Sequence, residues 1–191
     1  MPMDFLIEDL GTCSVEPINY LLDSNIWLKV ISPQNKEKPS DRKYRAFFEE
    51  IIATKGAKIV LPALVVSEVM NRLLRDIHYK KFKINKGVPP DVDSSFYKNH
   101  FRPSAEYRAA YALIADEFRI YLNNLILIND DFGKSIKYKH VLSHFNFNLD
   151  FNDCYYYHLS KKNKYVMVTD DGDFYVSGIR ILTLNTKLLS K

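Results

Sequence analysis

Short apolar runs alternate with segments of helical spacing along this chain, and no other feature limits its fold as strongly. The apolar runs at 20–22, 58–61, 125–128, 165–169 and 181–184 are typical of short buried strands. Apolar residues recur at helical spacing within 41–54, 63–78, 104–122 and 153–162, and residues 24–28 begin a further helix. Alternating units of this kind predict an α/β fold in which helices cover both faces of a parallel sheet.

The length and composition indicate one folded domain. A chain of 191 residues fits a single domain, and a hydrophobic content of 47% excludes disorder as its main state. The longest apolar stretch, 59–66, is too short for a bilayer span and contains Pro62, and the acidic N-terminus lacks the basic head of a secretory signal. We therefore expect a cytoplasmic protein with no membrane association, in which Cys13 and Cys154 are free thiols.

The formal net charge of +4 is concentrated in two segments. Residues 72–108 hold nine Lys and Arg against four Asp and Glu, and residues 134–164 hold six against two. Phe and Tyr are interleaved with these cations, a pattern that suits a phosphate backbone with unstacked bases. Solvated helix faces on a mildly basic protein explain the same pattern equally well.

Several familiar sites are excluded by what the chain lacks. Its six glycines form neither a GxGxxG fingerprint nor a phosphate-binding loop, and the sequence contains neither a GxSxG elbow nor paired CxxC motifs. His140 and His144 stand four residues apart without a third ligand nearby, so we expect them to be surface residues.

Five acidic residues lie where a parallel sheet presents its functional edge. Asp23 ends the first predicted strand, Asp171 and Asp173 follow another, Asp153 begins a helix and Glu68 lies near the start of one. Each has an ordinary structural role open to it, as a helix cap, a turn residue or a partner in an exposed ion pair. Carboxylates gathered in one crevice would repel one another, so either some are protonated or a hard cation such as Mg²⁺ or Mn²⁺ neutralises them. We favour the cation.

At these residues the sequence resembles the PIN-domain family, a nuclease fold that includes the VapC-type toxins. The run Leu21-Leu22-Asp23-Ser24-Asn25 is similar to the opening of the family pattern, and Glu68 is similar to its second acid. Asn152-Asp153 fits the third acid, and the segment from Val168 to Phe174 fits the strand end that follows. The match spans roughly 19–188 and includes the closing strand.

The resemblance implies a three-layer α/β/α fold and hydrolysis of RNA phosphodiester bonds with Mg²⁺ or Mn²⁺. The metal would be held by Asp23, Glu68, Asp153 and Asp171, with Asp173 as an alternative to Asp171. Ser24, Asn25 and Thr169 would support these ligands, and Arg72 and Arg75 would hold the substrate phosphate or satisfy Glu68. An antitoxin and a second copy of the chain are the partners that the resemblance adds to RNA.

The chain departs from the family pattern in three segments. We expect an N-terminal extension over 1–18, a nuclease domain over 19–191, and insertions near 80–102 and 130–149. Gly87 and Pro89-Pro90 predict a loop over 83–93 within the first insertion. An alternative function is a PIN-like module that binds RNA or protein without catalysis. An aspartyl phosphotransferase is disfavoured because Asn25 stands where a second aspartate is needed.

Overall fold

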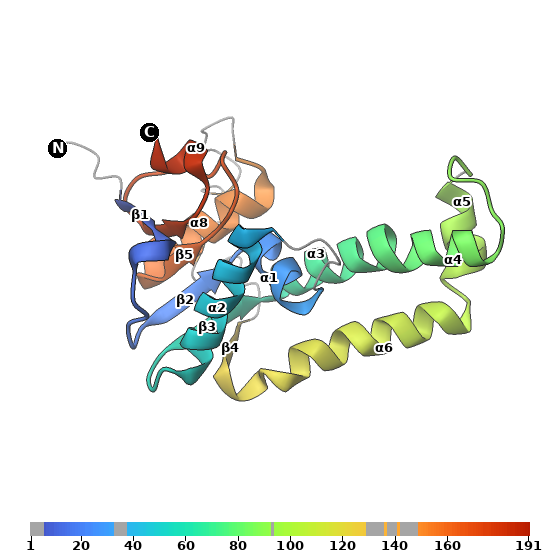
Figure 1. Ribbon diagram of the computed structural model, residues 1–191, viewed down its shortest axis with the longest axis horizontal. Coiled ribbons are helices and arrows are strands. Elements are labelled where there is room, and N and C mark those ends of the chain that lie inside the picture. Colours follow the sequence, from blue (N-terminus) through green and yellow to red (C-terminus); the bar gives the residue numbers. More distant parts are fainter. Residues whose placement is uncertain (1–5, 33–37, 93, 129–135, 137–140, 142–148) are drawn as a thin grey trace.

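The computed structural model describes residues 6–32, 38–92, 94–128, 136, 141 and 149–191. Within them, six parallel strands form one sheet in the order β1-β6-β5-β2-β3-β4 (Figure 1). The strands are β1 Leu6–Asp9, β2 Asn19–Leu22, β3 Lys58–Pro62, β4 Leu125–Ile128, β5 Val166–Val168 and β6 Arg180–Thr183. The predicted parallel α/β fold is confirmed. The expected surface histidines, His140 and His144, and most of the insertion near 130–149 lie outside the described residues.

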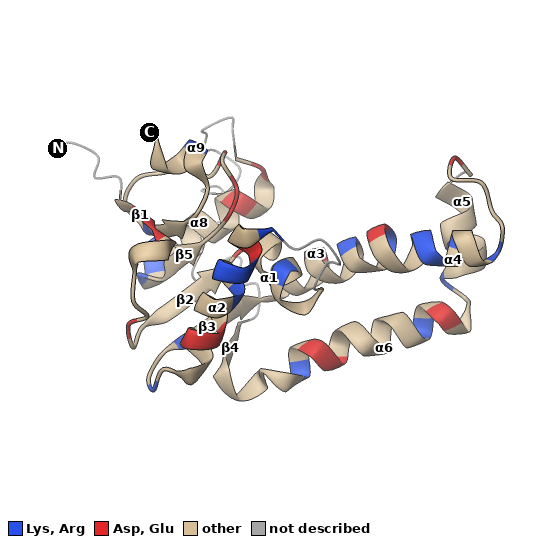
Figure 2. Ribbon diagram, in the orientation of Figure 1, with Lys and Arg blue, Asp and Glu red and all other residues tan. Residues whose placement is uncertain are grey.

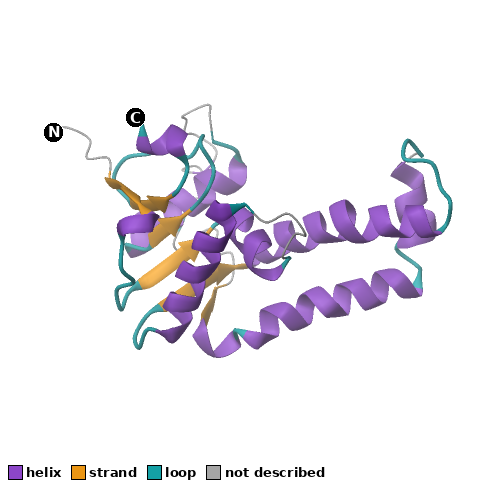
Figure 3. Ribbon diagram, in the orientation of Figure 1, coloured by secondary structure: helices purple, strands orange, loops and turns teal. Residues whose placement is uncertain are grey.

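Helices cover both faces of the sheet, as Figure 3 shows. They are α1 Ser24–Ile31, α2 Pro39–Ala53, α3 Ala63–Leu73, α4 Lys80–Asn85, α5 Ser94–Phe96, α6 Ala105–Ile120, α8 Phe151–Asn163 and α9 Thr186–Leu189. The chain runs from β2 outward through β3 to β4 and then returns to β5 on the other side of β2. Right-handed crossovers therefore place α1 and α2 on one face of the sheet and α8 on the other (Figure 1).

The core is built from the central strands and the aromatic side chains that pack on them. Leu21 and Leu22 of β2 are fully buried, as are Val60 of β3 and Met167 of β5. Trp27 of α1 is buried too, and its ring lies 5.5 Å from that of Phe48 and 5.1 Å from that of Phe118. Burial on both faces explains why these strands read as continuous apolar runs in the sequence. None of the helices in the described ranges is both long and apolar enough to cross a bilayer.

Strand β1 was missed by the sequence analysis, which places residues 1–18 outside the nuclease domain. Leu6–Asp9 pairs in parallel with β6, so that Ile7 lies opposite Ile181. Glu8 accepts hydrogen bonds of 2.8 and 2.9 Å from the guanidinium of Arg180 on that neighbour. The strand lies at the edge of the sheet and carries two acids, so its apolar pattern is too weak to be recognised.

A two-helix arm projects from the sheet (Figure 1). The outgoing helix runs through α3, the π-helical turn η2 Leu74–Tyr79 and α4, and the return runs through α5, the π-helical η3 Tyr97–Phe101 and α6. The sequence analysis ends the outgoing helix near His78 and begins a loop at Lys83, and both boundaries are wrong because the helix continues to Asn85. A second cluster of buried rings at the tip, Phe82, Tyr97 and Phe101, supplies the packing that prolongs it. Ser104 caps α6 by accepting a hydrogen bond from the Tyr107 amide, as its position predicts.

Candidate metal centre

The predicted acids lie around the point where the strand order reverses. Because all six strands are parallel, their carboxyl ends share one edge of the sheet, and β2 and β5 are the neighbours at which the chain changes direction. Asp23 follows β2 directly, and its amide donates to the Val168 carbonyl at the end of β5. Thr169 and Asp171 follow β5, so both strands deliver polar side chains to this crevice.

The carboxylate of Asp23 is buried and is held by three side chains, two from the first turn of α1 and one from the end of β5. Asp23 occupies the N-cap position of α1, yet its Oδ2 atom accepts hydrogen bonds from Thr169 Oγ1 at 2.8 Å and from Asn25 Nδ2 at 2.6 Å. Ser24 Oγ donates to the other oxygen at 3.3 Å. Only 5% of the Asp23 surface is exposed. Three polar neighbours that fix a buried carboxylate are more than a helix cap requires, so capping alone does not explain this residue.

Thr169 connects Asp23 to Asp171. While its hydroxyl donates to Asp23, the same oxygen accepts a hydrogen bond of 3.0 Å from the Asp171 amide. Asn25 adds a second link, because its side-chain oxygen accepts from the Asp170 amide at 3.2 Å. The loop after β5 is thereby fixed against the end of β2. Asp171 also accepts a hydrogen bond of 2.8 Å from the Asp173 amide, so it takes part in an ordinary Asx turn as well.

Glu68 and Asp153 come from helices that meet at the same edge. Asn152, at the start of α8, donates to Glu68 Oε2 of α3 at 3.2 Å and joins the two helices. Asp153 belongs to a capping box, in which its amide donates to Asp150 Oδ1 at 2.9 Å and its carboxylate accepts from the Asp150 amide at 3.3 Å. The helix-terminus role that the sequence leaves open for Asp153 is therefore present, whereas no ion pair joins Glu68 to Arg72 or Arg75 in the described part of the chain.

The electrostatics of these acids show that they share one field. The pKa of Asp23 is raised from 3.8 to about 6, mainly by burial and also by the charges of Glu68 and Asp171, while the Thr169 hydrogen bond opposes the rise. Burial is also the main cause that raises the pKa of Asp153 to about 8, with added repulsion from Asp150, Asp23 and Asp171. A cation bound among these acids would relieve the repulsion.

The donor chemistry of this crevice fits Mg²⁺ or Mn²⁺. The charged groups that Asp23, Glu68, Asp153 and Asp171 bring to it are carboxylates, and hard cations prefer oxygen ligands. The hydroxyl of Tyr156, in α8, is buried without a hydrogen-bond partner among the described residues, and it lies in the field of Glu68, Asp23 and Asp153. A water bound to a metal ion among the acids could supply the hydrogen bond that this hydroxyl lacks. The acids do not form a closed ligand set by themselves, since no group of three ready to hold an ion occurs within the described ranges.

Two neighbouring acids of the loop after β5 point elsewhere. Asp173 is exposed and pairs with Lys187 of α9, whose hydrogen bond holds the pKa of Asp173 below its usual range. Asp170 pairs with Lys29 of α1 at 3.1 Å. The structure therefore brings Asp171 to the Asp23 carboxylate and leaves Asp173, the alternative suggested by the resemblance, on the surface.

Residues that support this loop were not found from the sequence. The Tyr44 hydroxyl of α2 is buried, lies 3.2 Å from the Thr169 carbonyl and 3.1 Å from Asp170 Oδ1, and accepts from the Leu184 amide at 2.7 Å. Asn185 donates to the Asp170 carbonyl at 2.6 Å. Tyr44 occupies an apolar position of a helix pattern, so only its partners in space reveal this role.

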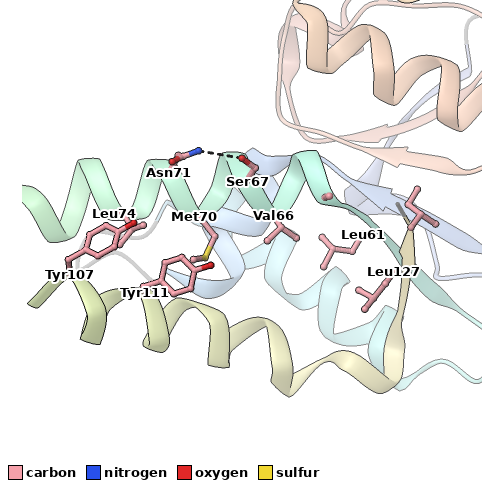
Figure 4. Close-up of a pocket in the computed structure, with 11 residues that line it drawn as sticks. Leu61, Val66, Ser67, Met70, Asn71, Leu74, Tyr107, Tyr111 and Leu127 are labelled. Carbon is pink, nitrogen blue, oxygen red and sulfur yellow. Dashed lines mark hydrogen bonds between the residues drawn. The ribbon is translucent and has the colours of Figure 1, made fainter. Parts of the chain in front are cut away.

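A groove lies between α3, α6 and the edge strand β4 (Figure 4). Its volume is about 510 Å³, and its lining from α3 includes Ser67, Met70, Asn71 and Leu74. These four residues form one stripe of the helix, whereas Glu68, Arg72 and Arg75 follow the adjacent stripe at the same spacing. The groove is largely apolar, with Leu61, Tyr111 and Leu127 in its walls, and is separate from the acid crevice.

This fold and site define a class of protein: a parallel α/β/α domain with a crevice of carboxylates where the strand order reverses. The family model for the PIN domain matches residues 20–178, and the chain belongs to this family. PIN domains are generally nucleases. The family name therefore agrees with the acids that the geometry brings together.

A solved structure shows the same fold at low sequence identity. The chain is similar to VapBC2 from Rickettsia felis, crystallised with a DNA fragment from its promoter, at a TM-score of 0.51 and 14% identity over 86% of this chain and 98% of that one. A second likeness is to PAE2754 from Pyrobaculum aerophilum, at a TM-score of 0.46 and 18% identity over 96% and 95% of the two chains. No curated protein sequence matches the chain significantly.

Proposed function

We propose that the protein is a metal-dependent endoribonuclease that hydrolyses RNA phosphodiester bonds. The single observation that carries this proposal is the carboxylate of Asp23, which is buried and ordered in the field of Glu68 and Asp171. Burial of a charged carboxylate costs free energy, and a bound cation would offset that cost. Family membership supplies the reaction class, since PIN domains are generally nucleases.

The residues have distinct parts in this proposal. Asp23, Glu68, Asp153 and Asp171 would hold Mg²⁺ or Mn²⁺. The bound ion supplies an activated water and neutralises charge on the phosphoryl group. Thr169 and Asn25 orient the Asp23 carboxylate through hydrogen bonds of 2.8 and 2.6 Å, and Asn152 holds Glu68. To hold the ion, Asp153 would exchange its hydrogen bond with the Asp150 amide, and Glu68 its hydrogen bond with Asn152, for metal ligation.

Cleavage of RNA tests the proposal directly. The purified protein with Mn²⁺ cuts single-stranded or structured RNA, EDTA stops the reaction, and Asp23→Asn lowers the rate by about 100-fold or more while the protein stays folded. Asp173→Asn is a matched control, because this nearby acid pairs with Lys187 and leaves the rate unchanged. If Asp23→Asn cuts RNA as fast as the parent, the assignment of Asp23 to the metal site is wrong.

The alternative function is a PIN-like module that binds RNA or protein without catalysis. One observation favours it: the carboxylate of Asp153 is engaged in a capping box and does not point freely into the crevice. Titration of the protein with Mn²⁺ in a calorimeter separates the two functions. A module without catalysis gives no heat that depends on the acids, whereas the nuclease gives heat that Asp23→Asn abolishes.

We further propose an antitoxin partner and action in the cytoplasm. The solved neighbour VapBC2 is a toxin–antitoxin complex, and the exposed cations of this chain suit an acidic protein. Co-expression with the product of a small adjacent gene tests this role. A toxin is harmful when expressed alone, and harm is relieved by the partner and by Asp23→Asn.

A further inference from the structure

The outgoing helix of the arm is strongly basic, and the returning helix is not. From α3 through α4 the helix carries five Lys and Arg against Glu68 and Asp76. Helix α6 carries two cations, Arg108 and Arg119, against three acids. Figure 2 shows the cations recurring toward the tip of the arm. This asymmetry gives one helix of the arm a positive field.

The basic helix begins at the candidate metal centre. Arg72 lies one turn beyond Glu68 and Arg75 nearly two turns beyond it, on the stripe that adjoins the apolar groove. The helix then continues to Asn85, and the rise of an α-helix places this end about 25 Å from Glu68. A polyanion bound in the acid crevice by a shared ion would therefore meet cations along this helix.

Two arginines converge on one ring at the tip. The guanidinium carbon of Arg75, from η2, lies 5.6 Å from the centroid of Tyr97, and that of Arg102, which follows η3, lies 5.5 Å from the same centroid. Tyr97 is buried and is fixed by edge contacts with Tyr79 at 5.0 Å. Both arginine side chains are exposed, and in the described ranges neither has a carboxylate partner.

Two like charges held at one ring without an acid are a site for an anion. The ring attracts each guanidinium by a cation–π interaction, and because both arginines are exposed their N–H donors stay accessible to a ligand. A guanidinium fork matches two oxygens of a phosphate group. We propose that Arg75 and Arg102, held over Tyr97, bind the phosphate backbone of the RNA strand that enters the candidate metal centre. This inference rests on the proposed function.

The geometry favours RNA over an acidic protein as the occupant. Arg75 lies on the continuation of the helix that carries Glu68, and Arg102 meets it at Tyr97, so one strand can contact both sites. The charge of an RNA strand repeats at every nucleotide. The aromatic rings of the tip are buried and serve as supports for cations, so base stacking is not the main contact. The site consequently reads the backbone and not the sequence.

The experiment measures RNA binding apart from cleavage. Anisotropy of a labelled oligo(U) of about 20 nucleotides is followed in EDTA on the Asp23→Asn protein, so that the strand stays intact. Arg75→Gln with Arg102→Gln weakens binding by about tenfold or more and lowers the slope of log K against log salt by about 1.4, the value for two single-strand phosphates. Arg102→Lys, which keeps the charge without the fork, loses less affinity than Arg102→Gln.

The matched control is Arg119→Gln, which removes an exposed arginine of α6 that pairs with Asp116 and leaves the affinity unchanged. Thermal unfolding checks that each variant stays folded. The inference is wrong if the double variant binds oligo(U) as tightly as its parent. It is also wrong if the two arginines are needed for binding poly-glutamate of equal length and not for binding oligo(U). Failure of the proposed function gives a different result. The parent protein then leaves RNA uncut with Mn²⁺, while RNA binding in EDTA still depends on the two arginines.

Discussion

The carboxyl group of Asp23 shows how the crevice couples protonation to folding. Its folded pKa of about 6 and that of Asp153 at about 8 both lie above the ordinary value of 3.8. Between about pH 4 and these values the folded chain keeps protons that the unfolded chain has released. These two groups therefore add most to the free energy of unfolding of the metal-free protein at acid pH. Their contribution is lost as the pH rises through about 6 for Asp23 and about 8 for Asp153.

Asp23→Asn removes one of these charges, so we expect the metal-free variant to be more stable than the parent at pH 8. The gain is about 1–3 kcal/mol and shrinks toward pH 4, where the parent is protonated. Urea unfolding in EDTA at both pH values measures it. A variant that is less stable than the parent at pH 8 would mean that the charge of Asp23 supports the fold.

Thr169 joins two of the acids through one hydroxyl, so its loss has a definite signature. Thr169→Val removes the donor to Asp23 and the acceptor for the Asp171 amide, and we expect affinity for Mn²⁺ to fall about 10–100-fold. Thr169→Ser keeps the hydroxyl and retains most of the affinity. Calorimetric titration measures both variants, and equal losses in the two would assign the effect to packing in this buried position.

At the residue scale the sequence predicts which acids follow strands, but not their direction. Asp23 and Asp171 were found because strand ends are marked by apolar runs. The choice between Asp171 and Asp173 depends on the Asx turn and on Lys187, which come from loop geometry and a distant helix. Asn152 and Tyr44 act through partners far along the chain, so periodicity alone gives no sign of them.

The arm is an element whose tip has a core of its own, formed by Phe82, Tyr97 and Phe101 and separate from the main cluster. Phe101→Ala removes a fully buried ring from it, and we expect the tip to open locally at a cost of about 3–5 kcal/mol while the sheet stays protected. Hydrogen exchange by mass spectrometry checks this, with Phe96→Ala, a less buried ring, as the milder control. Faster exchange throughout the sheet would contradict two separate cores.

The helix boundaries of the arm illustrate what local pattern omits. Apolar positions at helical spacing predicted α3, and Ser104 marked the start of α6. The continuation of the outgoing helix to Asn85 depends on contacts with Tyr97 and Phe101, which follow a Gly- and Pro-containing loop in the sequence. Tertiary packing of this kind outweighs weak local preference.

For the whole molecule, β1 makes the N-terminal segment part of the sheet. Deletion of residues 1–10 removes the parallel partner of β6, the Glu8–Arg180 ion pair and the buried side chain of Leu10. We expect the free energy of unfolding to fall by about 2–4 kcal/mol. Denaturant unfolding of the truncated protein measures the loss, and unchanged stability would mean that the segment is a dispensable extension.

The five strands β2 to β6 were within reach of the sequence because each is an apolar run, and the helices between β2, β3, β4 and β5 favour a parallel sheet. The edge strand β1 was not, because charged edge strands lack that pattern.

The central claim is that acids from four parts of the chain share one cation. Crystals grown with Mn²⁺ and measured at a wavelength where manganese scatters anomalously test it most directly. The account predicts one strong peak about 2.0–2.3 Å from carboxylate oxygens of Asp23 and at least one of Glu68, Asp153 and Asp171, and its loss in Asp23→Asn. A peak elsewhere, or none in the crevice at saturating Mn²⁺, would contradict it.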